Sequence, residues 1–115
     1  MDDPVKFILL VPLRYNDGTE VPNKVILDFQ ERLFALGGGF TVAGTVEGAY
    51  RMEDGSKQID HSLQIWIWLK EDYVPDLERA VAELGAKLGQ ESMYLERTGS
   101  SLGLIPPKPR GGDQP

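Results

Sequence analysis

His61-Ser-Leu-Gln-Ile-Trp-Ile-Trp-Leu-Lys70 is the stretch of sequence that decides how this chain folds. Side chains alternate between the two faces of a β-strand, so one face carries aliphatic residues from Leu63 to Leu69 and the other carries Trp66 and Trp68. A strand with one wet face alternates apolar and polar residues, whereas a strand covered on both faces is apolar almost throughout. The stretch therefore predicts a central strand with helices on its aliphatic face and a second cover over the two tryptophans.

The chain on either side of this strand changes its apolar period in a regular order. An apolar run over Lys6–Tyr15 predicts a first strand, in which Pro12 marks a bulge or the strand end. Spacings of three and four from residue 22 predict a helix that the glycines 37–39 end. Residues 40–52 alternate with period two, which predicts a strand paired as a hairpin with the tryptophan-bearing strand.

A second helical period and a short last strand complete the chain. The helix is predicted from Asp72 or Tyr73 to Leu88, and the strand over Glu91–Arg97. The resulting order, β-α-β-β-α-β, is that of the ferredoxin-like fold, an α+β architecture with two helices on one face of a four-stranded antiparallel sheet. The first and third strands are central in this topology, which agrees with their apolar composition.

Composition predicts one domain with a tail. The expected boundaries are an N-terminal extension over residues 1–5, a ferredoxin-like domain over residues 6–97, and a flexible Gly- and Pro-rich tail over residues 98–115. The tail contains a PxxP pattern, which is common in solvated termini. With no signal-peptide pattern at the N-terminus and no apolar run near the ~20 residues that span a bilayer, we expect a soluble cytoplasmic protein.

The charge and the missing residue types exclude several classes of function. The chain has no cysteine, one histidine and a net charge of −6. These features disfavour disulfides, thiolate chemistry and a zinc site, so no cofactor or metal is expected. The acidic charge disfavours nucleic acids and anionic membranes as partners. The triple glycine follows a helix rather than preceding one, so it does not fit a phosphate-binding loop.

The hairpin and the last strand supply the candidate site residues. On the sheet face opposite the helices we expect five residues that would form a ligand or interface surface: Thr45, Glu47, Gln64, Trp66 and Trp68. The candidate catalytic residues are Glu47, Tyr50, Arg51, His61, Glu91 and Tyr94, with Arg97 as a second anion-binding group. A slip of one residue in a strand would exchange the two faces, so these placements depend on register.

Three covers for Trp66 and Trp68 stay open at this point: a second subunit, a small ligand and the chain's own tail. An exposed patch of two tryptophans is rare on a monomer, and aromatic residues are enriched in subunit interfaces. The leading hypothesis is therefore a non-enzymatic homodimer that binds a small apolar ligand or a protein partner. A cofactor-independent enzyme acting on an apolar or aromatic substrate is the alternative, and a subunit of a larger complex is a third interpretation.

The region over residues 6–97 resembles small uncharacterised bacterial proteins with a ferredoxin-like fold of the dimeric α/β-barrel type. The resemblance lies in the Gly44–Gly55 hairpin, the hydrophobic third strand and Gly89-Gln-Glu-Ser-Met93. It implies a homodimer, and related dimeric folds include cofactor-free monooxygenases and muconolactone-isomerase-like enzymes. Their active sites lie between the open sheet face and the helices or loops. No catalytic motif of those enzymes can be placed on residues of this sequence, and a shared fold does not carry function with it.

Overall fold

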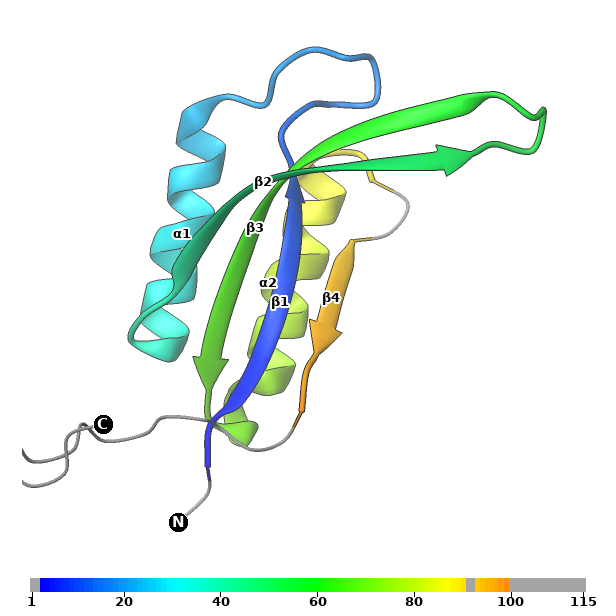
Figure 1. Cartoon of the computed structure of the whole chain (residues 1–115). Helices are drawn as coiled ribbons and strands as arrows, with labels where there is room; N and C mark the ends of the chain where they lie inside the picture. Colours follow the sequence, from blue (N-terminus) through cyan, green and yellow to red (C-terminus); the bar gives the residue numbers. More distant parts are fainter. Residues whose placement is uncertain (1–2, 91–92, 100–115) are drawn as a thin grey trace, which may run out of the picture.

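A computed structural model describes residues 3–90 and 93–99 and confirms the predicted α+β fold. The elements are β1 (Val5–Pro12), α1 (Asn23–Gly37), β2 (Thr41–Arg51), β3 (Lys57–Leu69), the 3-10 turn η1 (Glu71–Tyr73), α2 (Val74–Lys87) and β4 (Tyr94–Arg97). The four strands pair antiparallel in the order β2-β3-β1-β4, and both helices lie on one face of the sheet (Figure 1). The predicted central strands are therefore the observed central strands.

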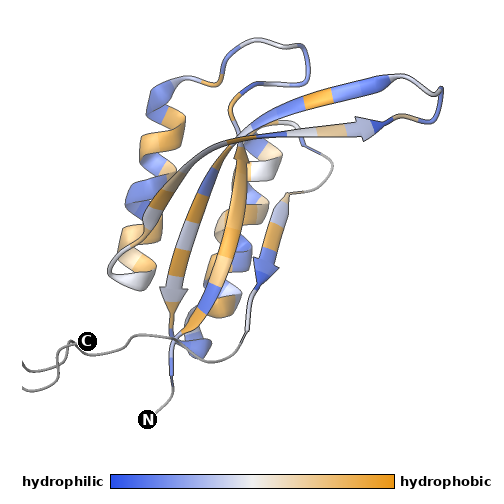
Figure 2. Ribbon diagram, in the orientation of Figure 1, coloured by the Kyte–Doolittle hydropathy of each residue, from blue (hydrophilic) through white to orange (hydrophobic). Residues whose placement is uncertain are grey.

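The core lies between the two helices and the central strands. Along β1 every second residue is buried, and these residues pair across the sheet with the aliphatic face of β3, as Leu9 does with Ile65. From the helices, α1 buries Ile26, Phe29 and Leu33, and α2 buries a stripe of residues that includes Leu77 and Leu84. Hydrophobic residues run almost continuously along β1 in Figure 2. This layer fixes which sheet face remains open.

One predicted strand boundary is confirmed and another differs from the structure for a local reason. β1 ends at Pro12, which the sequence marked as a bulge or the strand end, because proline has no N–H to donate to the ladder. β3 begins at Lys57, four residues before the predicted start at His61, because the hairpin partner β2 continues to pair as far as Arg51. The pairing of Arg51 with Lys57 adds a polar extension that the apolar pattern did not reveal.

A β-bulge interrupts β2 near its start. The pairing of Val42 with Ile65 is followed by the pairing of Gly44 with Gln64, so Ala43 is an extra residue in β2. Gly44 has φ 117°, a backbone conformation that glycine adopts without a steric penalty. Because the bulge adds one residue, every β2 side chain after it lies on the opposite face from the one that uninterrupted alternation predicts.

The β2–β3 hairpin extends beyond the layer of the helices (Figure 1). We call residues 49–60 the hairpin arm, since every residue in this range is exposed. The arm turns at Asp54, whose side chain accepts hydrogen bonds from the backbone N–H and the hydroxyl of Ser56 at 2.8 and 2.6 Å. Gly55 at φ 87° completes the turn.

Some of the predictions fall on residues outside the described ranges. Glu91 and the predicted tail from residue 100 onward belong to this group, so tail coverage of the tryptophans stays a prediction. Among the described residues, no helix combines the length and the apolar character that crossing a membrane requires.

Candidate binding site on the open sheet face

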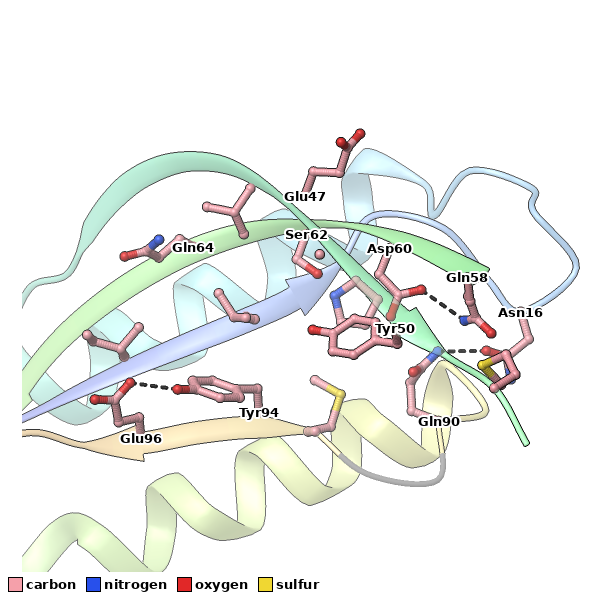
Figure 3. Close-up of a pocket in the computed structure, with 17 residues that line it drawn as sticks. Asn16, Glu47, Tyr50, Gln58, Asp60, Ser62, Gln64, Gln90, Tyr94 and Glu96 are labelled. Atoms are coloured by element: carbon pink, nitrogen blue, oxygen red, sulfur yellow. Dashed lines mark hydrogen bonds between the residues drawn. The ribbon is translucent and has the colours of Figure 1, made fainter. Parts of the chain in front are cut away.

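The sheet face opposite the helices, which we call the open face, contains a concavity of about 940 Å³ (Figure 3). Its floor is formed by Ile8 and Leu10 of β1. Side chains from β2, β3, β4 and the loops at one end of the sheet surround this floor, and the residues that the following paragraphs use are Asn16, Gly48, Tyr50, Gln58, Asp60, Gln90, Tyr94 and Glu96. The floor is apolar and the surrounding groups are mostly polar, an arrangement typical of small-molecule sites.

Tyr94 and Glu96 form the β4 side of the concavity. Both alternate onto the open face, where Tyr94 pairs with Leu10 and Glu96 pairs with Ile8. The Tyr94 hydroxyl donates a hydrogen bond to Glu96 Oε1 at 2.7 Å. This hydrogen bond is the main reason that the pKa of Tyr94 lies above its ordinary value, because it stabilises the protonated phenol next to a carboxylate. Tyr94 is therefore a neutral donor at physiological pH, and Glu96 is positioned by it.

Tyr50 forms the β2 side, and a glycine two residues earlier makes room for its ring. A Cβ atom on Gly48 would lie 2.8 Å from the Tyr50 hydroxyl oxygen and 3.0 Å from two ring carbons. The Tyr50 ring thus lies over Gly48, along the strand and within the concavity (Figure 3). A glycine inside a strand is compatible with a bulge or a close backbone approach, and here Gly48 accommodates an aromatic side chain.

The β3 wall and the rim are held by side-chain hydrogen bonds. Gln58 Nε2 donates to Asp60 Oδ1 at 2.9 Å, which orients the Asp60 carboxylate beside Tyr50 (Figure 3). At the rim, Gln90 Nε2 donates to Asn16 Oδ1 at 3.1 Å, and Asn16 Nδ2 donates to the Gly89 carbonyl at 3.0 Å. These two hydrogen bonds of Asn16 join the β1–α1 loop to the residues that follow α2. Hydrogen bonds therefore connect the wall residues Gln58 and Asp60 to each other and the rim residues Asn16 and Gln90 to each other.

The charge of the concavity has one sign. Among the described residues that line it, three carry carboxylates, Glu47, Asp60 and Glu96, and none is Lys, Arg or His. Figure 3 shows Glu47 directed away from the concavity, so Asp60 and Glu96 supply its negative charge. Two tyrosine rings lie beside these carboxylates. Carboxylates and aromatic faces both attract cations, so the site favours a ligand that carries positive charge.

Trp66 and Trp68 lie on the open face as predicted, next to the concavity rather than inside it. Trp66 pairs with Ile8 and Trp68 pairs with Lys6, and both tryptophans are half-buried. The Lys6 ammonium lies 4.3 Å from the centroid of the Trp66 ring and 5.2 Å from that of Trp68, and Trp66 Nε1 donates to Gln64 Oε1 at 2.7 Å. Part of the cover that the sequence required thus comes from the chain's own Lys6 and Gln64.

The predicted placement of Thr45 and Glu47 on the open face is wrong. After the bulge at Ala43, Thr45 pairs with Leu63 and Glu47 pairs with His61, so both lie on the face that the helices cover elsewhere. Glu47 Oε2 is 3.7 Å from His61 Nδ1, and this pair is well exposed. Gln64, in contrast, lies on the open face beside Trp66, as predicted.

The candidate catalytic residues do not converge on one point. Tyr50 and Tyr94 both line the concavity. Arg51 pairs with Lys57 on the opposite face of the hairpin, away from Tyr50. Arg97 also faces the helix side, where Nη1 donates to Glu71 Oε2 at 2.9 Å and Nη2 donates to Oε1. Neither arginine is therefore placed to hold an anion on the open face.

Sequence reasoning missed several groups that line the concavity. Asp60 and Gln58 follow the same alternation as Ser62. Extending the predicted strand upstream from His61 to Lys57 would have placed both residues on the open face. Asn16 reaches the rim from a loop, and no periodic pattern could have indicated its partner Gln90, 74 residues away. Among the described residues, no group of three or more His, Cys, Asp or Glu side chains gathers as a metal site would require.

Comparison with known proteins supports the fold. No family model matches the chain, and no curated protein matches it. Among solved structures, a phage SAM lyase in complex with S-methyl-5'-thioadenosine is similar, with a TM-score of 0.66 and 17% sequence identity over 85% of this chain and 82% of that chain. The expected relation to bacterial barrel-type proteins stays a prediction. The chain is an α+β protein whose four-stranded antiparallel sheet and two helices are arranged as in that lyase.

Proposed function

We propose that this protein binds an S-adenosylmethionine-type sulfonium compound in the open-face concavity and cleaves its S–C bond. The observation that carries the proposal is the lining itself, where the Asp60 and Glu96 carboxylates stand beside the Tyr50 and Tyr94 rings with no basic side chain among the described residues. S-adenosylmethionine carries a sulfonium and an ammonium charge together with an aromatic base. A concave surface with negative charge and aromatic rings complements all three features.

The fold likeness to a SAM lyase supports this assignment of ligand class. The ligand in that structure, S-methyl-5'-thioadenosine, is the thioether that remains when the amino-acid side of S-adenosylmethionine departs. Because 17% identity establishes the fold alone, the proposal depends on the chemistry of this chain's own lining. The cofactor-independent enzyme that the sequence left as an alternative is thereby preferred to the non-enzymatic binding module.

The cleavage that fits this site needs no external reagent. The carboxylate of S-adenosylmethionine attacks its own Cγ, a new C–O bond forms, and the S–Cγ bond breaks with its electron pair passing to sulfur. The products are S-methyl-5'-thioadenosine and homoserine lactone, so nothing is oxidised or reduced. Positive charge on sulfur and negative charge on the carboxylate disappear together, and removing water from both groups therefore speeds the reaction.

Because sulfur loses its positive charge during the reaction while the ammonium group keeps its charge, the lining residues have different roles toward the two groups. A carboxylate held against the sulfonium would stabilise the substrate more than the transition state, because the sulfonium loses its charge during the reaction. We therefore assign Asp60 and Glu96 to the ammonium group, whose charge does not change. The Tyr50 and Tyr94 rings are assigned to the sulfonium, where they exclude water and contribute a weaker cation–π attraction.

The proposal is tested by titration and product analysis on the full chain. Isothermal titration with S-methyl-5'-thioadenosine and chromatography after incubation with S-adenosylmethionine should show binding and an accelerated release of the thioether and the lactone. Asp60→Asn and Glu96→Gln should each raise KM about tenfold or more, as expected for loss of a charge-assisted contact. Glu78→Gln removes a carboxylate from the exposed surface of α2 and should change neither the affinity for the thioether nor KM.

The outcomes separate the two functions that the sequence left open. Binding of the thioether without turnover of S-adenosylmethionine would favour a non-enzymatic binding module. The absence of both at millimolar ligand, with the fold confirmed by circular dichroism, would overturn the proposed function.

A further inference from the structure

We propose that a second cavity beside the open-face concavity binds the α-amino-acid end of the sulfonium substrate, and that Arg14 holds the carboxylate of that end. This cavity has a volume of about 230 Å³, and its lining comes mainly from the end of β1, the β1–α1 loop and the first residues of β3. The residues that it shares with the concavity are Asn16, Gln58, Asp60, Ser62 and Gln90. One ligand can therefore extend from the concavity into the second cavity. The inference rests on the proposed function and adds to it the orientation of the substrate.

The second cavity carries charges of both signs, whereas the concavity carries negative charge alone. Its lining includes Arg14 and Asp60. His61 also borders it, but His61 Nδ1 lies 3.7 Å from Glu47 Oε2, which belongs to the opposite face of the sheet. An α-amino acid carries its ammonium and its carboxylate on the same carbon atom, so its binding site must offer opposite charges within one small space. A guanidinium and a carboxylate that line one cavity meet this requirement.

The backbone around Arg14 places this residue on the open-face side of the sheet. Arg14 forms an isolated β-bridge with Glu20, so the chain is extended here and its side chains alternate between the two faces. Leu13 and Tyr15, the residues on either side of Arg14, pack against the core. The Leu13 N–H also donates to the His61 carbonyl at 3.0 Å, which connects the loop to β3. The loop therefore holds Arg14 at the cavity before a ligand arrives.

Arg14 forms no ion pair in the part of the chain that the structure describes, with its cross-strand neighbour Glu20, with Asp60 or with another carboxylate. A guanidinium can bind a carboxylate through two parallel hydrogen bonds, so a ligand carboxylate is a fitting partner for it. Of the two carboxylates assigned to the ammonium group, Asp60 is the one that lines both cavities. The substrate ammonium is thus assigned to Asp60, where the cavities meet, and the substrate carboxylate to Arg14.

The contact with Arg14 acts on substrate binding rather than on the rate of cleavage. The substrate carboxylate loses its negative charge as the lactone forms, so Arg14 stabilises the bound substrate at least as much as the transition state. Arg14→Gln should therefore raise KM for S-adenosylmethionine about tenfold or more and leave kcat unchanged or higher. A purely structural role for Arg14 would lower kcat as well.

Titration calorimetry on the full chain with three related thioethers tests the inference. S-adenosylhomocysteine carries both charges of the amino-acid end, its decarboxylated form carries only the ammonium, and S-methyl-5'-thioadenosine carries neither. Arg14→Gln should weaken the binding of S-adenosylhomocysteine about tenfold or more and change the other two affinities less than about twofold. Asp60→Asn should weaken both ligands that carry the ammonium. Arg79→Gln removes the same charge from the exposed surface of α2 and should change none of the three affinities.

Circular dichroism and thermal unfolding show whether each variant keeps the fold. Arg14→Lys retains the charge but not the paired hydrogen bonds, so its affinity for S-adenosylhomocysteine should lie between those of the wild-type chain and Arg14→Gln. Equal losses for all three ligands in Arg14→Gln, or no loss for S-adenosylhomocysteine, would overturn this inference and leave the proposed function standing. A wild-type chain that binds none of the three ligands would overturn the proposed function, and this inference with it.

Discussion

At the scale of single residues, Gly37 is required because a backbone atom of β3 occupies the space that a side chain would need. A Cβ atom on Gly37, the last residue of α1, would lie 2.8 Å from the backbone oxygen of Trp68 and 3.2 Å from the Ile67 side chain. The end of α1 is thus in direct contact with the backbone of β3, which cannot move aside as a flexible side chain can.

Gly37→Ala is predicted to destabilise the protein by about 1–3 kcal/mol, the usual cost of overpacking. Urea unfolding monitored by circular dichroism measures the difference in the free energy of unfolding. Gly39→Ala is the matched control, because a Cβ there meets nothing within 4 Å. Equal free energies for the two variants would show that the helix end does not touch the sheet.

Gly48 gives a prediction about ligand binding rather than stability. Its absent Cβ leaves room for the Tyr50 ring, and that ring can swing outward because its hydroxyl end is free to move. Gly48→Ala should therefore leave the free energy of unfolding nearly unchanged but weaken thioether binding several-fold. Titration calorimetry measures the affinity, with Ala49→Ser on the opposite hairpin face as control. A loss of stability without a loss of affinity would contradict the role assigned to Gly48.

At the scale of elements, β4 is connected to the turn before α2 by the Arg97–Glu71 ion pair. The hydrogen bonds from Arg97 hold the pKa of Glu71 below its ordinary value of 4.5. A carboxylate with a lowered pKa in the folded state stabilises that state above its unfolded pKa, and this contribution is lost as the pH falls through the folded pKa.

Glu71→Gln should therefore be less stable than the wild-type chain at pH 7, and the difference should vanish near pH 2–3. Urea unfolding at the two pH values measures it, and Glu78→Gln, an exposed acidic residue on α2, should show no such pH dependence. The effect is expected to be small because both partners are about half-exposed. A difference that persists unchanged at low pH would rule out the ion pair as its cause.

The elements themselves could be predicted from periodicity, but the faces of one strand could not. The helical stripes of α1 and α2 and the aliphatic face of β3 are buried as the sequence predicts. The bulge at Ala43 exchanges the faces of β2, and Gly44 and Gly48 were both compatible with such an irregularity. Because register depends on tertiary pairing, Thr45 and Glu47 were assigned to the wrong face while Gln64 was assigned correctly.

At the scale of the whole molecule, the tryptophans that determine the fold do not form the centre of the site. Sequence correctly places Trp66 and Trp68 on the open face, yet Lys6 from the neighbouring strand covers part of both rings. The concavity lies further along the sheet, where Tyr50 and Tyr94 line it together with the loop residues Asn16 and Gln90. Local sequence patterns do not indicate which residues distant in the chain lie side by side. The lining of the concavity could therefore not be predicted before the pairing of the strands was known.

The most direct test of the central claim is to map where the ligand binds. In a ¹H–¹⁵N correlation spectrum titrated with S-methyl-5'-thioadenosine, the largest shift changes should fall on amides of the concavity, notably Gly48, Tyr50, Asp60 and Tyr94. Amides on the exposed surfaces of α1 and α2 should not move. Saturable shifts confined to those concavity residues are the predicted result, whereas shifts centred on the helices, or none at millimolar ligand, would contradict the assignment of the open face as the binding site.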